Sequence, residues 1–296
     1  MKRKMLRLGL MLIVIGFCSS GALATTMGPP VACLDAGQFS IGLDYSTNDI
    51  GVDIDGKETS LYGMKIYLGD EKTADKEVTE GPEKFKLSDE IDSDMVFANL
   101  GYGVSDKLEV FLRLGAADID MIDMDGGDDF AYGFGAKATF YEEGKVKLGA
   151  LFQMTWASAD GDLDAEDVHI RDEKEGIDEV LEDVPGTWDI DYYQLKFAVG
   201  PTYELTEGCS IYGGPFYHLV SGDLERKYSY VDTYDAGVFS VEERYSQKMS
   251  GDIEESSSFG VYIGAQVDLA ANLPIAVEYQ LTGDTDVIGA SLVYRF

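Results

Sequence analysis

The residues of this 296-residue chain that could take part in chemistry are mostly charged, and few of them are nucleophiles paired with bases. The chain has 55 acidic and 23 basic residues, but only two histidines and three cysteines. His218 precedes Ser221 by three positions, so the two do not share one face of a strand, which an i, i+2 spacing would allow. His169 has no nucleophile at a useful spacing either. We therefore expect no enzymatic activity.

The second candidate chemistry is cation binding by carboxylates. Residues 157–189 contain thirteen acidic residues against Arg171 and Lys174, and residues 117–129 contain acidic residues and no base. Carboxylates at this density suit hard cations such as Ca²⁺, and a site for divalent cations would use Asp118, Asp120, Asp123, Asp125 and Asp128. The EF-hand pattern is incomplete there, so a solvated, repulsive loop is the competing interpretation.

The elements that carry these residues show the period of β-strands. Apolar residues occupy every second position in ten segments, and each segment is close to the 9–11 residues with which a tilted strand crosses a bilayer. The segments are 39–45, 96–102, 108–114, 130–140, 146–156, 193–203, 211–219, 259–269, 275–281 and 288–296. The seventh is interrupted by Gly213-Gly214-Pro215.

The connections between these segments alternate in length. Those at 105–107, 141–145, 206–208 and 270–274 are tight turns, whereas those at 47–94, 117–129, 157–189 and 221–255 are long and acidic. Short periplasmic turns and long external loops are typical of transmembrane barrels. The sequence predicts an all-β, antiparallel, up-and-down transmembrane barrel of about ten strands, with eight or twelve as alternatives. The strand-like segment 61–68 is then expected in a hairpin above the membrane, together with residues 50–54.

The amino-terminal end predicts export. Lys2, Arg3, Lys4 and Arg7 precede an apolar run and Ala22-Leu23-Ala24, which is the pattern of a signal peptide over residues 1–24. After cleavage, 19 basic residues face 55 acidic ones, a net charge of about −36, so nucleic acid is excluded as a partner. We expect residues 25–37 to form a periplasmic segment and residues 38–296 the barrel.

The carboxy-terminal end predicts the membrane. Leu292, Tyr294 and Phe296 alternate with polar residues up to an aromatic carboxy-terminus. This ending and the strand–turn–strand at 102–110 resemble the small outer-membrane barrels of Gram-negative-type bacteria, a class that includes OmpA-, OmpX- and OmpW-like and porin-like proteins. The resemblance implies a cell outer membrane location, periplasmic termini, contact with outer-membrane lipids, and insertion by the barrel-assembly machinery, which would read Leu292, Tyr294 and Phe296.

Two other classes of protein remain as alternatives. An outer-membrane hydrolase would be of the omptin type, with acidic pairs and a histidine at the outer rim, or of the deacylase type, with adjacent inward histidine and serine. A secreted soluble β-sandwich would show the same alternation of apolar residues. The aromatic residues near both ends of the segments favour the barrel, because aromatic side chains gather at both membrane interfaces.

The inward positions of the predicted barrel contain both signs of charge. They are Asp44, Glu109, Arg113, Lys137, Lys147, Lys196, Glu204, Asp268, Glu278 and Arg295. A barrel of about ten strands leaves little free lumen, so these charges either pair in a closed polar core or line a narrow channel; porin-like and structural surface functions are both open. External carboxylates would attract cations to such a barrel, and no cofactor is expected beyond loosely bound Ca²⁺. Cys33 and Cys209 could form a disulfide in an oxidising compartment.

Overall fold

The chain forms one antiparallel β-sheet in the computed structural model, which describes residues 26–69, 71–121, 129–172, 177–255 and 258–296 and leaves out the side chains of 164–183. The described residues form eleven strands. These are β1 (Phe39–Leu68), β2 (Glu71–Ser105), β3 (Leu108–Asp120), β4 (Asp129–Glu143), β5 (Val146–Asp172), β6 (Ile177–Thr206), β7 (Cys209–Ala236), β8 (Phe239–Glu255), β9 (Phe259–Ala270), β10 (Leu273–Leu281) and β11 (Thr285–Arg295). No helix of this described part is long and apolar enough to span a membrane.

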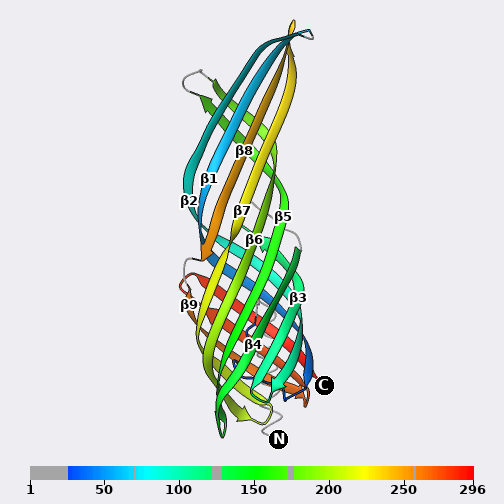
Figure 1. The fold of residues 1–296 in the computed structure, drawn as a ribbon, viewed down its shortest axis with the longest axis vertical. Helices are drawn as coiled ribbons and strands as arrows, with labels where there is room; N and C mark the ends of the chain where they lie inside the picture. Colours follow the sequence, from blue (N-terminus) through cyan, green and yellow to red (C-terminus); the bar gives the residue numbers. More distant parts are fainter. Residues whose placement is uncertain (1–25, 70, 122–128, 173–176, 256–257) are drawn as a thin grey trace.

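Ten of the strands close into a ring, which we call the lower barrel (Figure 1). The first and last strands pair from Ser40 with Arg295 to Ile50 with Thr285, so that the sheet has no free edge there. The backbone groups of Phe39 and Phe296 complete the closure with two hydrogen bonds. The predicted antiparallel barrel of about ten strands is confirmed. The β-sandwich alternative is wrong, because one sheet closes on itself and no second sheet of described residues packs against it.

Five strands of the ring continue beyond the lower barrel and, together with β8, form a second part, which we call the extension (Figure 1). It consists of the β1–β2, β5–β6 and β7–β8 hairpins, and β8 pairs with β7 on one side and with the distal half of β1 on the other. The predicted long loops at 47–94, 157–189 and 221–255 are therefore mostly strands. Segment 61–68 lies in a hairpin above the ring, as predicted, within the continuous strand β1.

The polarity of the two faces reverses between the lower barrel and the extension. In the lower part of β1, apolar Ile41 and Leu43 point outward and polar Asp44 points inward. Beyond residue 49 the inward residues are apolar, as with Ile54, and the outward residues are carboxylates, as with Asp53. The apolar side of the strand therefore faces outward in the lower barrel and inward in the extension. The inward apolar side of the extension is the pattern of a β-structure exposed to water.

The outer surface of the lower barrel is an apolar belt. Many of its large side chains are exposed, among them Leu43, Leu112, Ile263 and Phe259. Contiguous apolar surfaces of this kind are rare on monomeric soluble proteins. The predicted insertion residues Leu292, Tyr294 and Phe296 are in this belt and are 40%, 45% and 65% exposed. Their predicted outward phase is confirmed, although their reading by an assembly machinery stays a prediction.

Candidate functional site

The interior of the lower barrel contains the amino-terminal segment Thr26–Leu34, which we call the plug. Met27, Val31 and Leu34 are each at most 3% exposed, although they belong to no strand. The sequence predicts residues 25–37 to be a periplasmic segment separate from the barrel. The structure instead places Thr26–Leu34 inside the ring, because the polar groups of the wall bind its backbone.

Two glutamates of the wall hold the plug. The backbone amides of Met27 and Gly28 donate to the two carboxylate oxygens of Glu278, each over 3.0 Å. The amide of Cys33 donates to Glu109 Oε2 over 2.8 Å. Hydrogen bonds to a charged acceptor are roughly twice as strong as those between neutral groups. These carboxylates therefore satisfy the plug backbone, whereas the sequence predicts that they pair with bases or line a channel.

Small residues of the wall make room for the plug. A side chain at Gly103 would place its Cβ 2.0 Å from the carbonyl oxygen of Asp35, directly after the plug, and one at Gly149 would place it 2.5 Å from that of Pro30. Such distances are far inside van der Waals contact, so glycine is required at both positions for the plug to pass this close to β2 and β5. The plug thus fits a wall shaped for it.

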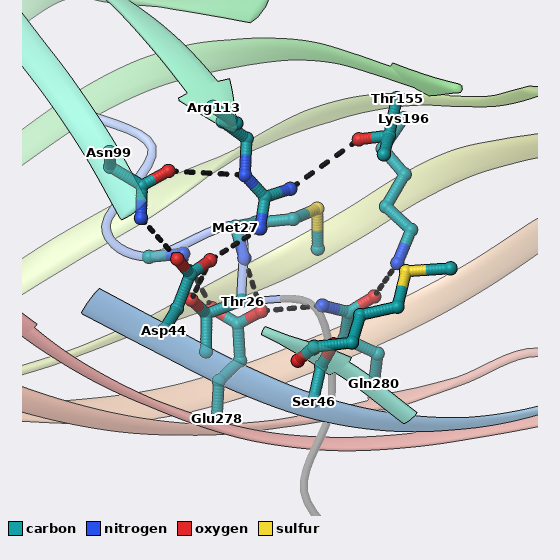
Figure 2. A network of polar contacts seen from close by, with 12 residues as sticks. Thr26, Met27, Asp44, Ser46, Asn99, Arg113, Thr155, Lys196, Glu278 and Gln280 are labelled. Atoms are coloured by element: carbon teal, nitrogen blue, oxygen red, sulfur yellow. Dashed lines mark hydrogen bonds and ion pairs between the residues drawn. The ribbon is translucent and has the colours of Figure 1, made fainter. Parts of the chain in front are cut away.

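A polar network lies at the level where the plug ends (Figure 2). Arg113 on β3 forms an ion pair with Asp44 on β1, and both side chains are at most 3% exposed. Arg113 Nε also donates to Asn99 Oδ1 over 3.2 Å, and the Asn99 amide donates to Asp44. Phe97 lies 4.1 Å from the guanidinium carbon of Arg113. The predicted pairing of opposite inward charges is confirmed for Asp44 and Arg113.

A second part of the network links β6 to β10 (Figure 2). Lys196 Nζ donates to Gln280 Oε1 over 2.9 Å, and Gln280 Nε2 donates to Glu278 Oε1 over 2.7 Å. Lys196 is 1% exposed. Gln280 therefore connects the buried ammonium to the glutamate that binds the plug.

The other predicted lumen charges lie nearer the lower rim. Lys137 and Arg295 line a cavity of about 90 Å³ between the plug and the wall, together with Arg113. This space accommodates a few water molecules, which makes it far narrower than an open channel. Lys147 pairs with Glu142 over 2.9 Å, Glu204 is exposed, and Asp268 is partly exposed. These last three residues are peripheral to the network.

An apolar core fills the interior above the network. Its residues come from all three hairpins of the extension and from β3 and β4, and those such as Ile50, Ile91 and Ile190 are fully buried. Burying one such side chain stabilises a fold by about 1.5–3 kcal/mol. The plug and this core are two successive closures of the same lumen.

His218 lies at the boundary between the network and the apolar core. Its Nδ1 is 2.8 Å from Glu255 Oε1, and both side chains are at most 1% exposed. Thr285 Oγ1 donates to the same carboxylate oxygen over 3.4 Å. The pair joins the end of β8 to β7, away from bulk water. His169 lies among the residues whose side chains are left out.

The predicted Ca²⁺ ligands are partly outside the described residues, since Asp123, Asp125 and Asp128 fall in the segment 122–128. Asp118 is partly exposed and Asp120 is exposed at the top of β3. Among the described residues, no group of three or more acidic, histidine or cysteine side chains is arranged to hold a metal ion.

The predicted disulfide is not present. Cys33 and Cys209 are not bonded to each other. The amide of Cys33 donates to Glu109 on β3, whereas Cys209 begins β7 and pairs with Val267 on β9. The partner strand of Cys33 is thus distant from the strand of Cys209, since three strands separate β3 from β7 in the shorter direction around the ring.

A row of carboxylates lies on the outer surface just above the apolar belt. Asp49 on β1 is directly opposite Asp92 on β2 and Asp286 on β11. Burial raises the pKa of Asp49, and the neighbouring Glu90 and Asp286 raise it further. Burial and four neighbouring aspartates, Asp49 foremost, raise the pKa of Asp92 in the same way. This row of carboxylates therefore has a negative potential that the neighbouring side chains do not neutralise.

Sequence reasoning missed the plug, its partner Thr139, and Gln280, which connects Lys196 to Glu278. A signal was available: residues 25–34 contain no charged side chain in a chain with 55 acidic residues. An uncharged segment directly after a signal peptide is unlike a solvated linker in such a chain. Thr139 and Gln280 carry no comparable signal, because their roles depend on the backbone amide and the side chains that meet them in the folded barrel.

Among known proteins, the chain has matches in solved structures alone. No protein-family model and no curated protein matches the chain. Among solved structures, the outer-membrane protease OmpT of Escherichia coli is 11% identical with a TM-score of 0.44, covering 87% of this chain and 97% of its own. The translocator domain of the autotransporter NalP of Neisseria meningitidis is 12% identical, with a TM-score of 0.35 and coverages of 83% and 88%. The toluene transporter TodX of Pseudomonas putida is 12% identical, with a TM-score of 0.32 and coverages of 89% and 90%. None of these values carries an activity over to this chain.

Proposed function

We propose that the protein is an integral barrel of the outer membrane of a Gram-negative-type bacterium. The lower barrel would span the hydrocarbon, and the extension would project outside the cell. The apolar belt supports this proposal, since it would otherwise be exposed to water. The carboxylates and apolar interior beyond residue 49 of β1 support an aqueous setting for the extension. Both termini would then face the periplasm.

We further infer that this barrel is sealed and that its function is that of a structural surface protein. The observation that carries the inference is the pair of closures in the lumen, the plug bound by Glu109 and Glu278 and the dry apolar core above it. A porin-like function would need a continuous aqueous path. The cavity of about 90 Å³ beside the plug does not supply one.

The inference includes the absence of enzymatic activity. His218 is the described histidine that an omptin-like or deacylase-like mechanism would use, and it is buried against Glu255. A general base must reach the proton that it removes from a bound substrate. The burial of His218 supports a structural role in joining β8 to the barrel.

Reconstitution in planar lipid bilayers tests the sealed barrel. We expect the mature protein to insert without steady conductance steps at high salt. A variant that lacks residues 26–34 should also remain closed, because the apolar core is a second barrier. A variant with serine in place of Ile50, Ile91 and Ile190 in addition should conduct. Steady conductance by the unmodified protein would overturn the inference in favour of a porin-like channel.

A further inference from the structure

The outer surface has a groove at the upper margin of the apolar belt, across β4 to β8. Its volume is about 430 Å³. The lining residues fall into two kinds, aromatic side chains nearer the belt and carboxylates nearer the extension. They are Tyr132, Trp156 and Tyr193 on the first side and Asp191, Asp223, Asp252 and Glu254 on the second.

The strand register arranges these side chains in two parallel rows. Tyr132 pairs with Trp156, which pairs with Tyr193, which pairs with Ser221. In the row one step higher, Asp191 pairs with Asp223, which pairs with Asp252. Ser221 and Gly222 are the small residues of the lining on β7, and their size leaves the groove open between the rows.

The aromatic row is a rigid platform. The rings of Tyr132 and Trp156 are nearly parallel, with centroids 5.3 Å apart and 13° between their planes. Phe130 stacks on Tyr132 with a centroid distance of 5.8 Å. Phe134 continues the row toward the belt, 5.9 Å from Trp156. The platform is thus continuous with the surface that would face acyl chains.

The three aspartates of the carboxylate row repel one another and so destabilise the sheet. Like charges directly opposite each other on neighbouring strands destabilise a sheet, and Asp191, Asp223 and Asp252 occupy three successive strands. None of the three forms an ion pair with another described residue, whereas Glu225, one row higher, pairs with Lys227 and Lys248. Burial and the carboxylates of Asp191, Asp160 and Glu225 raise the pKa of Asp189, a further sign of this negative field.

The chemistry of the two rows indicates a cation. Exposed rings attract a cation placed over their faces, and carboxylates accept hydrogen bonds from it. The described carboxylates do not converge as metal ligands, which favours an organic cation held between rings and acids. An ammonium with three N–H donors can contact both rows at once.

We propose that this groove binds the headgroup of an outer-leaflet lipid that has a primary ammonium. The groove lies where the apolar belt meets the carboxylates, which is the headgroup level if the lower barrel spans the membrane. The inference therefore rests on the proposed membrane location. The acyl chains of the lipid would extend over Phe134 and Phe152, and its ammonium would contact Asp191 and Asp223.

The test measures lipid retention by native mass spectrometry. The mature protein is reconstituted in vesicles of equal parts phosphatidylethanolamine and phosphatidylglycerol with matched chains, and retained lipids are counted after extraction in detergent. We expect about tenfold more phosphatidylethanolamine than phosphatidylglycerol, the ratio that corresponds to about 1.4 kcal/mol. D191N/D223N/D252N should bring the two lipids to parity, and Trp156→Leu should lower the ratio several-fold.

The matched control is D49N/D92N/D286N, which removes an equal row of carboxylates on β11, β1 and β2. The row beneath them contains Ile288, Thr47 and Asp94, with no aromatic side chain. This control should keep the tenfold ratio. Equal loss in both variants, a preference that disappears with EDTA, or no preference in the unmodified protein would overturn the proposal. A protein that fails to insert into the vesicles at all would instead refute the membrane location.

Discussion

Removing one partner of the buried pair between Asp44 and Arg113 is expected to cost far more than removing both. Arg113→Met leaves the Asp44 carboxylate, on a side chain that is 3% exposed, with no cation beside it. An uncompensated buried charge typically costs about 3–5 kcal/mol. We expect the same range for Asp44→Leu, which leaves the Arg113 guanidinium alone in the interior.

The double variant D44L/R113M tests the physical reasoning. Both charges are then absent, and the remaining penalty comes from the polar side chains that lose a partner, which are Asn99, Thr26 and Thr155. An unsatisfied buried polar group costs about 1–3 kcal/mol. The double variant should therefore be less destabilised than either single one, which corresponds to a coupling of several kcal/mol.

The assay is reversible urea unfolding in lipid vesicles, followed by tryptophan fluorescence and by heat-modifiable migration on gels. Lys86→Met is the control, because Lys86 and Asp55 form an ion pair that is mostly exposed, and such pairs contribute about 0–1 kcal/mol. Additive costs, with the double variant destabilised by the sum of the single ones, would refute the view that these two charges are retained in the interior as a mutually dependent pair.

Three further predictions concern the two faces of the strands. Ile54→Asp should destabilise the extension by at least about 3 kcal/mol, because it buries a carboxylate in the apolar core, whereas Asp55→Asn on the outer face should leave its protease resistance unchanged; equal cleavage would contradict the reversed polarity. Leu292→Asn, on the lipid side, should lower the free energy of unfolding in urea by about 1–3 kcal/mol, and Ser291→Asn should lower it less. Equal losses would mean that the strand phase is wrong. Burial and neighbouring carboxylates raise the pKa of Asp49, so the folded state binds its proton more tightly; its contribution is present at low pH and is lost as the pH rises through the folded value. The upper end of the lower barrel, where Asp49 faces Asp286, should therefore be more stable to heat in acidic than in neutral buffer. Asp49→Asn should reduce that difference, and an unchanged difference would rule out this carboxylate as a source.

The barrel could be predicted from the sequence because its signal is repeated in each strand. One apolar side chain at every second position, as from Phe39 to Tyr45, fixes the outward phase of a strand without knowledge of its neighbours. The exposed positions of Leu43 and Leu112 follow that prediction. The extension was missed as a strand structure because acidic residues in segments such as 47–94 resemble solvated loops, although Ile50, Val52 and Ile54 continue the period.

The site was predictable only in part, because its partners come from backbone groups. The opposite signs of Asp44 and Arg113 suggest a pair, and that pair forms. Glu109 and Glu278 bind backbone amides of the plug instead of bases. Nearly every residue has such an amide, so the sequence does not show which of them will meet a glutamate. The acids alone could not reveal whether their partners would be lysines, water or a folded segment.

The reversal of polarity near residue 49 of β1 explains why one chain needs two kinds of closure. Below this level the outward side must be apolar if lipid surrounds it, so the polar residues are inside, and a polar interior must be satisfied by hydrogen bonds or filled with water. The plug supplies amides to Glu278 in this lower part. Above the reversal, the proposed location surrounds the strands with water, the apolar residues turn inward, and their packing excludes water without any plug. A lumen that is polar and plugged where the wall meets lipid, and apolar where the wall meets water, follows from placing one continuous sheet in two solvents.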